Sequence, residues 1–301
     1  MTHAELLQLA STYQISAIAF TDHDSLVTPE VLSSLSKDSS TKWISGIEIS
    51  SDSNLHIVGL FVDPTNPNLL NHCELAQKSR INRMQKIVVN LKNIGFNISV
   101  EDCLKASGGE SVGRPHIVEA LMSHSENLIT LDKLRQKMAD DSTVTNKYEA
   151  MMQRGPSQYP YVLLLSSDAY FPNIYVDTSY QVNLDQSVAL IRQAGGLAFI
   201  AHYSTIKNKI SLPDLEKILA NKRVDGMETI YGIDMPDWQS DCLALQKLAE
   251  KSNLLISGGS DVHTADQLMA FANNKEYSHK TIGLVKKIIS TSGVDTTWSS
   301  F

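Results

Sequence analysis

Several features that would assign this chain of 301 residues to a common protein class are missing. Its three cysteines, Cys73, Cys103 and Cys242, are far apart and form no Cys-x-x-Cys pair. This argues against a thiolate zinc site or a disulfide framework. No apolar run reaches the roughly 20 residues that cross a bilayer, and the first residues have no signal-peptide pattern. We therefore expect a cytoplasmic protein that does not associate with membranes.

Positive charge is also scarce. The formal net charge is −7 at pH 7, so the chain lacks the basic composition of a protein that coats duplex DNA. A nucleotide or short oligonucleotide is still compatible with this charge, because bound divalent cations reverse the sign of the local field. The length allows one large α/β domain with a smaller domain inserted in it.

Apolar runs that alternate with helical periods predict a mostly parallel α/β architecture at both ends of the chain. Residues 68–155 have helical periodicity and little strand signal, which predicts a helical insertion subdomain. We expect residues 1–67 and 156–301 to form the barrel domain around it. Residues 155–183 have no clear period, and we expect a loop with a short hairpin there.

Histidine and carboxylate side chains recur where the apolar strands end. The candidate metal ligands are His23, Glu48, His56, His116, His202, Asp261 and His263. Each has an ordinary alternative, such as a solvated turn for His23 or a satisfied core histidine for His56. Glu48, however, interrupts an apolar strand, where a carboxylate must be paired, metal-bound or at the mouth. Five strand ends with such side chains favour one metal centre at one mouth of an α/β barrel.

The chemistry of these ligands limits the metal and the reaction. Mixed imidazole and carboxylate ligands suit Mn²⁺, Zn²⁺ or Fe²⁺ better than Ca²⁺. Several such ions a few ångströms apart suit the hydrolysis of phosphate esters. Asp261 and His263 project to one side of an extended segment and are the candidate catalytic pair. Arg114, at the start of a helix, is a candidate substrate contact because a guanidinium forks onto phosphate.

Other polar residues carry weaker expectations. Asp22 or Asp24 is a candidate hydrogen-bond partner for His23. Glu228, a second carboxylate inside a strand, either supports the centre or forms a structural ion pair. The remaining histidines are expected to be surface or packing residues: His3, His72, His124 and His279.

Taken in order, TDHD, GIEIS, LHIVGL, GRPHIVEAL, IAH and GGSDVH resemble the PHP superfamily (polymerase and histidinol phosphatase). The branch they resemble is the RNase AM and nucleoside 3′,5′-bisphosphate phosphatase group. The resemblance implies a distorted (β/α)7 barrel with a helical insertion and a trinuclear centre, with Mn²⁺ as the expected metal. It implies that Glu48 bridges ions, that Asp261 is a ligand of one ion and that Arg114 contacts phosphate. The implied imidazole ligands of the other two ions are His56 with His116, and His23 with His202 and His263.

The chain departs from that family at two places. The family opens with a strand that carries His-x-His, followed by Ser-Asp-Gly, and this chain begins where a later helix start aligns. Either the start codon was assigned too far downstream, which we favour, or the chain is a natural truncation. For the chain as it stands we expect at most two metal ions. The second departure is Tyr203, where the family usually has proline after Ala-His.

Three functions follow from these observations. The leading one is a metal-dependent phosphoesterase acting on 3′,5′-bisphosphate nucleotides or on short RNA from its 5′ end, as a 5′-3′ exoribonuclease does. The alternative is a catalytically impaired module that binds a nucleotide or a partner protein. A histidinol-phosphatase-like enzyme is a third reading, against which the helical insertion argues.

Overall fold

The computed structural model of the chain describes residues 2–35, 39–52, 55–108, 111–207, 209–221, 223–231, 237–274 and 283–301. Contacts cluster in two compact units. The first unit consists of Met1–Cys73 with Gln181–Phe301, and the second, which we call the helical unit, is Glu74–Tyr180. Residues 156–180, which we expected in the barrel domain, therefore cluster with the helical unit.

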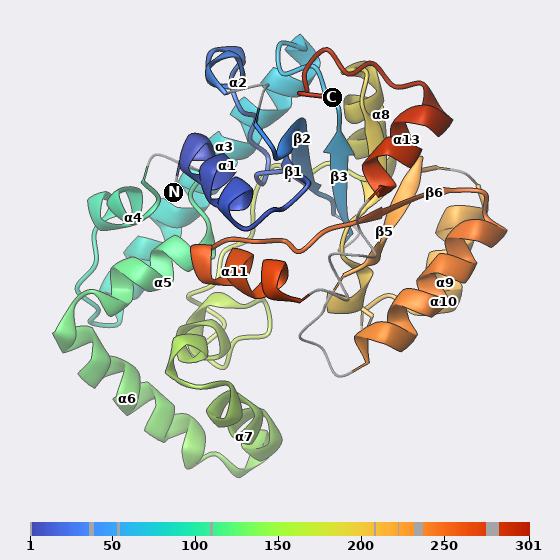
Figure 1. Cartoon of the computed structure of the whole chain (residues 1–301). Coiled ribbons are helices and arrows are strands. Elements are labelled where there is room, and N and C mark those ends of the chain that lie inside the picture. The colour runs from blue at the N-terminus through green and yellow to red at the C-terminus, as the bar shows by residue number, and fades with distance from the viewer. Residues whose placement is uncertain are drawn as a thin grey trace. The chain divides into compact units, whose positions relative to one another are not determined.

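One six-stranded sheet forms the first unit, in the order β1-β2-β3-β4-β5-β6 (Figure 1). Its strands are β1 (Ala17–Phe20), β2 (Lys42–Ser50), β3 (His56–Leu60), β4 (Leu197–Ile200), β5 (Gly226–Ile230) and β6 (Leu255–Gly258). Neighbouring strands are parallel, except that β3 is antiparallel to both β2 and β4. The link between β2 and β3 is too short for a crossover, so the chain reverses there. The curled sheet, a half-barrel, confirms the expected α/β fold.

Burial is most complete along β2. Its residues 43–49 are all buried, and only the two end residues are partly exposed. A strand covered on both faces has a continuous apolar run instead of alternation, and the sequence WISGIEI has this character apart from Glu48. The strand therefore holds an acidic side chain where the fold excludes water.

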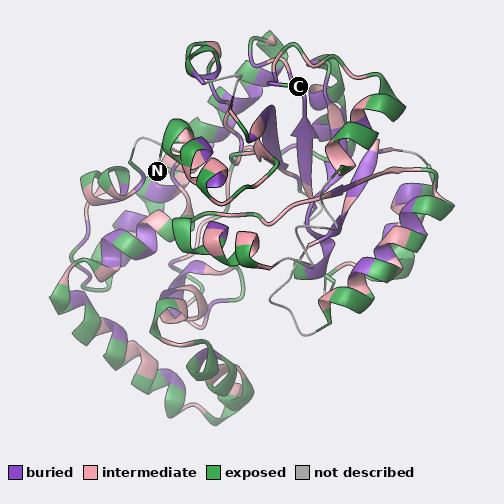
Figure 2. Ribbon diagram, in the orientation of Figure 1, coloured by how far each residue is buried: buried purple, intermediate pink, exposed green. Residues whose placement is uncertain are grey.

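Helices cover the sheet of the first unit. They are α1 (His3–Thr12), α2 (Pro29–Ser34), α8 (Leu184–Gln193), η4 (Tyr203–Thr205), α9 (Leu212–Ala220), α10 (Trp238–Lys251), α11 (Ala265–Asn273) and α13 (Leu284–Ser292). α8 contacts β3 and β4, α10 contacts β5 and β6, and α13 contacts β6. Figure 2 shows buried strands beneath helices that are exposed on their outer sides. Such one-sided burial is what the helical apolar period predicts.

The helical unit contains no strand of the sheet among its described residues. α3 (Pro67–Asn93) starts in the first unit and continues here. It is followed by α4 (Val100–Ala106), α5 (Arg114–Met122), α6 (Ser125–Ala139), η1 (Ser142–Val144), α7 (Thr145–Arg154), η2 (Pro156–Gln158) and η3 (Tyr161–Leu165). The helical periodicity read from residues 68–155 is confirmed by α3 to α7.

The expected loop with a short hairpin at residues 155–183 is wrong. Instead, the helical turns η2 and η3 occupy its first part. The physical reason is tertiary packing: Leu163, Leu164 and Leu165 are fully buried in one apolar cluster with residues of α3 and α5. Packing of this kind overrides local propensity, and this segment has no apolar periodicity from which its helical turns could be predicted.

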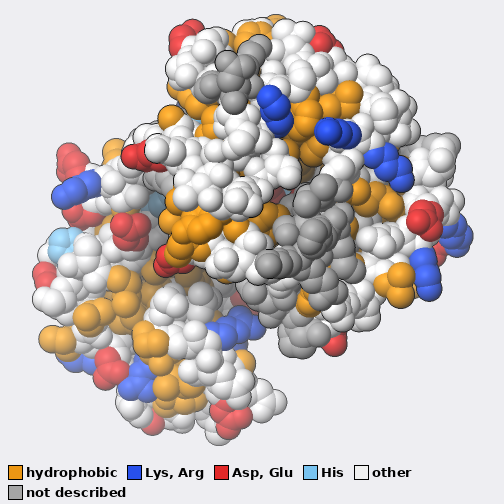
Figure 3. Space-filling view, viewed as in Figure 1, with side chains coloured by type: hydrophobic (Ala, Val, Ile, Leu, Met, Phe, Trp, Pro, Cys, Tyr) orange, Lys and Arg blue, Asp and Glu red, His pale blue; other side chains and the backbone are white. Residues whose placement is uncertain are grey.

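The surface carries charges of both signs. On the described part of the face in Figure 3, lysine and arginine side chains are interspersed with acidic ones. Among the described residues, no helix is at once long and apolar enough to cross a bilayer.

We predict that Leu164→Ala destabilises the chain by about 2–5 kcal/mol, because it removes a fully buried side chain and leaves a cavity. The measurement is chemical unfolding followed by circular dichroism. The matched control is Leu128→Ala, since Leu128 is 44% exposed and its loss should change stability by no more than about 0.5 kcal/mol. Equal effects of the two substitutions would contradict the packing of η3.

Candidate metal centre

Three imidazoles surround the buried carboxylate of Glu48. Its Oε1 accepts hydrogen bonds from Nδ1 of His56 at 2.7 Å and from Nε2 of His202 at 2.8 Å. Nδ1 of His23 lies 3.4 Å from Oε2. One carboxylate thus contacts three imidazoles from separate segments of the chain, which indicates that these residues form a single site.

The register of the sheet explains why these groups meet. In the antiparallel pair of β2 and β3, Ser50 faces His56 and Glu48 faces Val58. Because side chains alternate between the faces of a strand, Glu48 and His56 are diagonal neighbours on one face. β4 runs antiparallel to β3, and the backbone N–H of Ala201 donates to the carbonyl of His56. His202 follows directly and so lies beside His56.

The TDHD segment extends the sheet next to Glu48. His23 forms an isolated parallel bridge with Glu48, and the N–H of Asp24 donates to the Glu48 carbonyl at 2.8 Å. Asp22 and Asp24, one of which we expected to support His23, each contact another histidine in the structure. Asp22 contacts Nε2 of His3 at 3.3 Å, and Asp24 contacts Nε2 of His72 at 3.1 Å.

Electrostatics keep Glu48 ionised. Burial by itself raises the pKa of Glu48, but hydrogen bonds from His202 and His56 and the charge on His23 outweigh burial and hold the pKa well below its usual value. Burial lowers the pKa of His202, yet its bond to Glu48 and the Glu48 charge raise that pKa to about 9. The carboxylate is therefore balanced in part by the proton that His202 keeps.

A divalent cation fits this donor set. Ligand atoms of His23, Glu48 and His56 lie within 4.8 Å of one another, and Nδ1 of His56 is 3.3 Å from Nε2 of His202. Two ring nitrogens this close, both aimed at one carboxylate oxygen, repel each other when both carry protons. A cation that replaces those protons relieves the repulsion, and imidazole with carboxylate suits a first-row transition metal.

Glu228 supports the centre from the next strand. Its Oε2 accepts the backbone N–H of His202 at 2.8 Å, and burial raises its pKa to about 8. A Cβ atom on Gly259 would lie 2.5 Å from Oε1 of Glu228. Because Gly259 has no side chain, the Glu228 carboxyl group has room to lie where it accepts the N–H of His202.

The candidate catalytic pair lies just past β6. Asp261 has a positive φ of 47°, a conformation that is uncommon for a non-glycine residue and is often found at functional sites. Its Oδ2 accepts a hydrogen bond from the Tyr231 hydroxyl at 3.4 Å, and the Tyr231 ring lies 5.5 Å from that of His202. His263 is more exposed, with Nδ1 at 2.8 Å from the Asp261 carbonyl.

Arg114 and His116 belong to the helical unit, so their role at the centre stays a prediction. Nδ1 of His116 accepts the N–H of Gly113 at 3.0 Å at the start of α5. A neutral imidazole that accepts at Nδ1 carries its proton on Nε2. To bind a cation through Nε2, His116 has to give up this bond.

Sequence reasoning left three residues of the first unit without the role that the structure gives them. His72 was assigned to packing, and it is buried, but it also contacts the carboxylate of Asp24. Glu228 was left undecided, and Tyr231 was not considered. A carboxylate inside the strand GMETI was the only available signal for Glu228, because its partner is a backbone N–H. His279 lies outside the described residues.

Comparison with known proteins places this geometry in context, although no family model matches the chain. It is 24% identical over 271 residues to the 5′-3′ exoribonuclease Rnm of Escherichia coli, covering 87% of this chain and 80% of the relative. It is 22% identical over 267 residues to a 3′,5′-nucleoside bisphosphate phosphatase of Chromobacterium violaceum, covering 87% and 82%.

A solved structure has the same fold. It is a crystal structure described as a putative metal-dependent phosphoesterase from Bifidobacterium adolescentis, with a TM-score of 0.61 and 20% identity, covering 87% of this chain and 82% of that one. The resemblance to the PHP superfamily is confirmed. Within it, the matches support the RNase AM and bisphosphate phosphatase branch. The relatives are named as an exoribonuclease and a phosphatase, and the structural neighbour is described as a putative metal-dependent phosphoesterase.

We predict that metal binding to this PHP-type centre releases protons. His202, with a pKa of about 9 in the metal-free protein, is protonated at pH 7.5 and must lose its proton to become a ligand. Metal affinity should therefore rise as pH increases towards 9. Calorimetric titration with Mn²⁺ in two buffers that differ in ionisation enthalpy measures the proton release. An identical apparent enthalpy in both buffers would contradict it.

A second prediction concerns Gly259. Gly259→Ala should displace the flexible end of Glu228 and weaken metal binding by about 10–100-fold, as loss of a group that orients a ligand does, with little change in melting temperature. Glu228→Ala should produce a similar loss. Because both changes remove the same contact, the double variant should be no worse than either single one, and additive losses in a double-mutant cycle would refute this link.

Proposed function

We propose that the chain hydrolyses phosphate esters of nucleotides, with 3′,5′-bisphosphate nucleotides or the 5′ end of short RNA as substrates. The observation that carries this proposal is the buried carboxylate of Glu48 shared by three imidazoles. The substrates come from the relatives, one of which is named as a 5′-3′ exoribonuclease and another as a 3′,5′-nucleoside bisphosphate phosphatase. Mn²⁺ as the metal and a cytoplasmic location are parts of the same proposal.

The residues of the first unit would hold the ions and orient them. Glu48, His23, His56 and His202 supply a carboxylate and three imidazoles from one face of the sheet. Divalent ions bound there would lower the pKa of a water molecule and balance charge on the phosphate oxygens. The protein's own task is positional, because Glu48 has no freedom within β2 and Glu228 fixes the backbone of His202.

Asp261 and Tyr231 complete the face on which a substrate would lie. The Asp261 carboxylate is exposed, unlike Glu48, and burial together with the charge of Asp261 raises the pKa of the Tyr231 hydroxyl. Tyr231 therefore stays protonated at neutral pH and is a hydrogen-bond donor. The accessible Asp261 carboxylate is therefore suited to bind a metal ion, and the Tyr231 hydroxyl beside it is suited to donate a hydrogen bond to a phosphate oxygen.

The test is an assay with added Mn²⁺ on adenosine 3′,5′-bisphosphate and on a short 5′-phosphorylated RNA. We expect phosphate release from the nucleotide or stepwise shortening of the RNA. Replacing a residue that only supports a metal ligand typically costs about 10–100-fold, and we expect Glu48→Gln to reduce turnover by more than that. Glu119→Gln, an exposed carboxylate on α5, is the control and should retain full activity. Turnover that survives Glu48→Gln, or none with either substrate, would reject the proposal.

A further inference from the structure

His202 is held at each of its polar atoms, and Thr205 holds two of them. Nε2 of His202 lies 2.8 Å from Oε1 of Glu48, and its backbone N–H donates to Oε2 of Glu228 at 2.8 Å. The carbonyl of His202 accepts the Thr205 N–H at 3.2 Å and the Thr205 hydroxyl at 3.0 Å. The same hydroxyl oxygen lies 3.3 Å from Nδ1 of the ring. Thr205 is thus the neighbour of the ring nitrogen that does not contact Glu48.

The three imidazoles at Glu48 differ in the nitrogen that they present to it. His23 and His56 approach the carboxylate through Nδ1, and His202 approaches it through Nε2. A neutral imidazole has one N–H and one lone pair, so a histidine that binds an ion through Nε2 must keep its hydrogen on Nδ1. A hydrogen-bond acceptor beside Nδ1 stabilises that tautomer. For His202, the group in that place is the Thr205 hydroxyl.

The Thr205 hydroxyl already donates its hydrogen elsewhere. A hydroxyl has one hydrogen to donate and lone pairs with which to accept. The His202 carbonyl, at 3.0 Å, is the nearer acceptor for that hydrogen, and Nδ1 is at 3.3 Å. With its hydrogen directed at the carbonyl, the hydroxyl presents a lone pair to Nδ1 and can accept the N–H there. Nε2 is then the nitrogen whose lone pair is available at the centre.

A short turn fixes the hydroxyl relative to the ring. η4 is a single 3-10 turn, in which the Thr205 N–H donates to the His202 carbonyl and the Ile206 N–H donates one residue further on. Tyr203 is buried, and its hydroxyl donates to the Ile210 carbonyl at 2.7 Å. Where the PHP family usually has proline, the chain therefore uses a buried ring and a hydrogen bond. Because backbone N–H groups close the turn, the Thr205 hydroxyl is not needed to form it.

We propose that Thr205 is a positioning residue of the metal centre, whose hydroxyl accepts the Nδ1–H of His202 and thereby directs Nε2 at a divalent ion. In this role Thr205 acts through His202 and touches neither the ion nor the substrate. The inference rests on the proposed function, because it concerns a ligand of the metal which that function requires. Thr205 is exposed, so a change of its side chain leaves no cavity in the core and the variants should fold.

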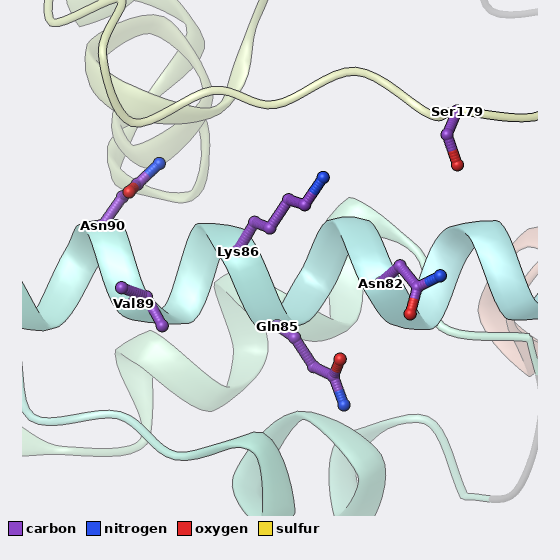
Figure 4. Close-up of a pocket in the computed structure, with 6 residues that line it drawn as sticks. All are labelled: Asn82, Gln85, Lys86, Val89, Asn90 and Ser179. Atoms are coloured by element: carbon purple, nitrogen blue, oxygen red, sulfur yellow. The ribbon is translucent and has the colours of Figure 1, made fainter.

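A metal titration that tests this proposal reports on the first unit. In the part of the chain that the structure describes, the group of histidine and carboxylate side chains close enough to hold an ion is His23, Glu48 and His56. The helical unit has a pocket of its own (Figure 4). It is lined by Asn82, Gln85, Lys86, Val89, Asn90 and Ser179. Because none of these lining residues offers an imidazole, thiolate or carboxylate, the pocket is unsuited to a transition-metal ion.

The first experiment measures Mn²⁺ affinity by calorimetry in the unmodified chain, Thr205→Val and Thr205→Ser. Valine has the shape of threonine without the hydroxyl, so we expect Thr205→Val to bind Mn²⁺ about 10–100-fold more weakly, as loss of a group that orients a ligand does. Thr205→Ser keeps the hydroxyl and should bind like the unmodified chain. The matched control is Thr12→Val, because the exposed Thr12 hydroxyl also donates to a backbone carbonyl, that of Gln8, at 3.0 Å.

The control should leave Mn²⁺ affinity unchanged, and melting temperatures of the metal-free proteins show that each variant is folded. Equal affinity in Thr205→Val and in the unmodified chain would overturn the proposal. So would an equal loss in Thr205→Val and Thr205→Ser, because the hydroxyl would then not be the group that matters.

The second experiment separates orientation of the ring from a structural role. In the Zn²⁺-loaded chain with isotope-labelled histidine, nuclear magnetic resonance shows which nitrogen of His202 carries the hydrogen, and the spectrum of His202→Gln identifies its signals. We expect the ion on Nε2 and the hydrogen on Nδ1, with faster exchange of that hydrogen with water in Thr205→Val. A zinc ion on Nδ1 would refute the proposal without the need for any Thr205 variant to fold, and an unchanged exchange rate in Thr205→Val would refute it as well.

Failure of this inference and failure of the proposed function give different results. Mn²⁺ binding and turnover that depend on Glu48 but not on Thr205 would keep the phosphoesterase and discard the role of Thr205. No Mn²⁺ binding by the unmodified chain would remove the metal centre, and the role of Thr205 with it.

Discussion

A carboxylate buried in an apolar strand needs compensation, and in this chain three imidazoles provide it for Glu48. That requirement constrains the sheet as well as the chemistry. His56 reaches Glu48 because β3 turns back beside β2, and His202 reaches it because β4 pairs with β3 in one register. A shift of one residue at either pairing would turn the imidazole to the opposite face and leave the carboxylate without a partner. The same pairings thus hold the fold and the candidate metal centre together.

Ion pairs of this kind are poor sources of stability, which bears on what the centre is for. Removing charges from water costs more than an imperfect pairing returns, so a protein gains little by burying them for stability alone. Here the cost is increased by two ring nitrogens 3.3 Å apart and by Glu228, whose pKa is raised to about 8 by burial close to the same site. Such accumulated strain is characteristic of functional sites, where binding of a ligand relieves it.

The sequence predicted those parts of the structure that depend on local patterns. The strand ends follow from apolar periods, and the side-chain types found there marked Glu48 and His56 as candidate ligands of one centre. Contacts made through backbone atoms leave no such pattern, which is why the bond from the His202 N–H to Glu228 was not foreseen. The conformation of residues 163–165 was also missed, because it depends on packing against helices that are distant in the sequence and not on a local pattern.

The acidic composition explains why any attraction of this chain for a nucleotide needs to be local. With a net charge of −7, the chain as a whole repels a nucleotide at long range, so attraction has to arise where cations or guanidinium groups are concentrated. The imidazoles around Glu48 would achieve this by holding divalent ions, because each ion brings more positive charge than the proton it replaces.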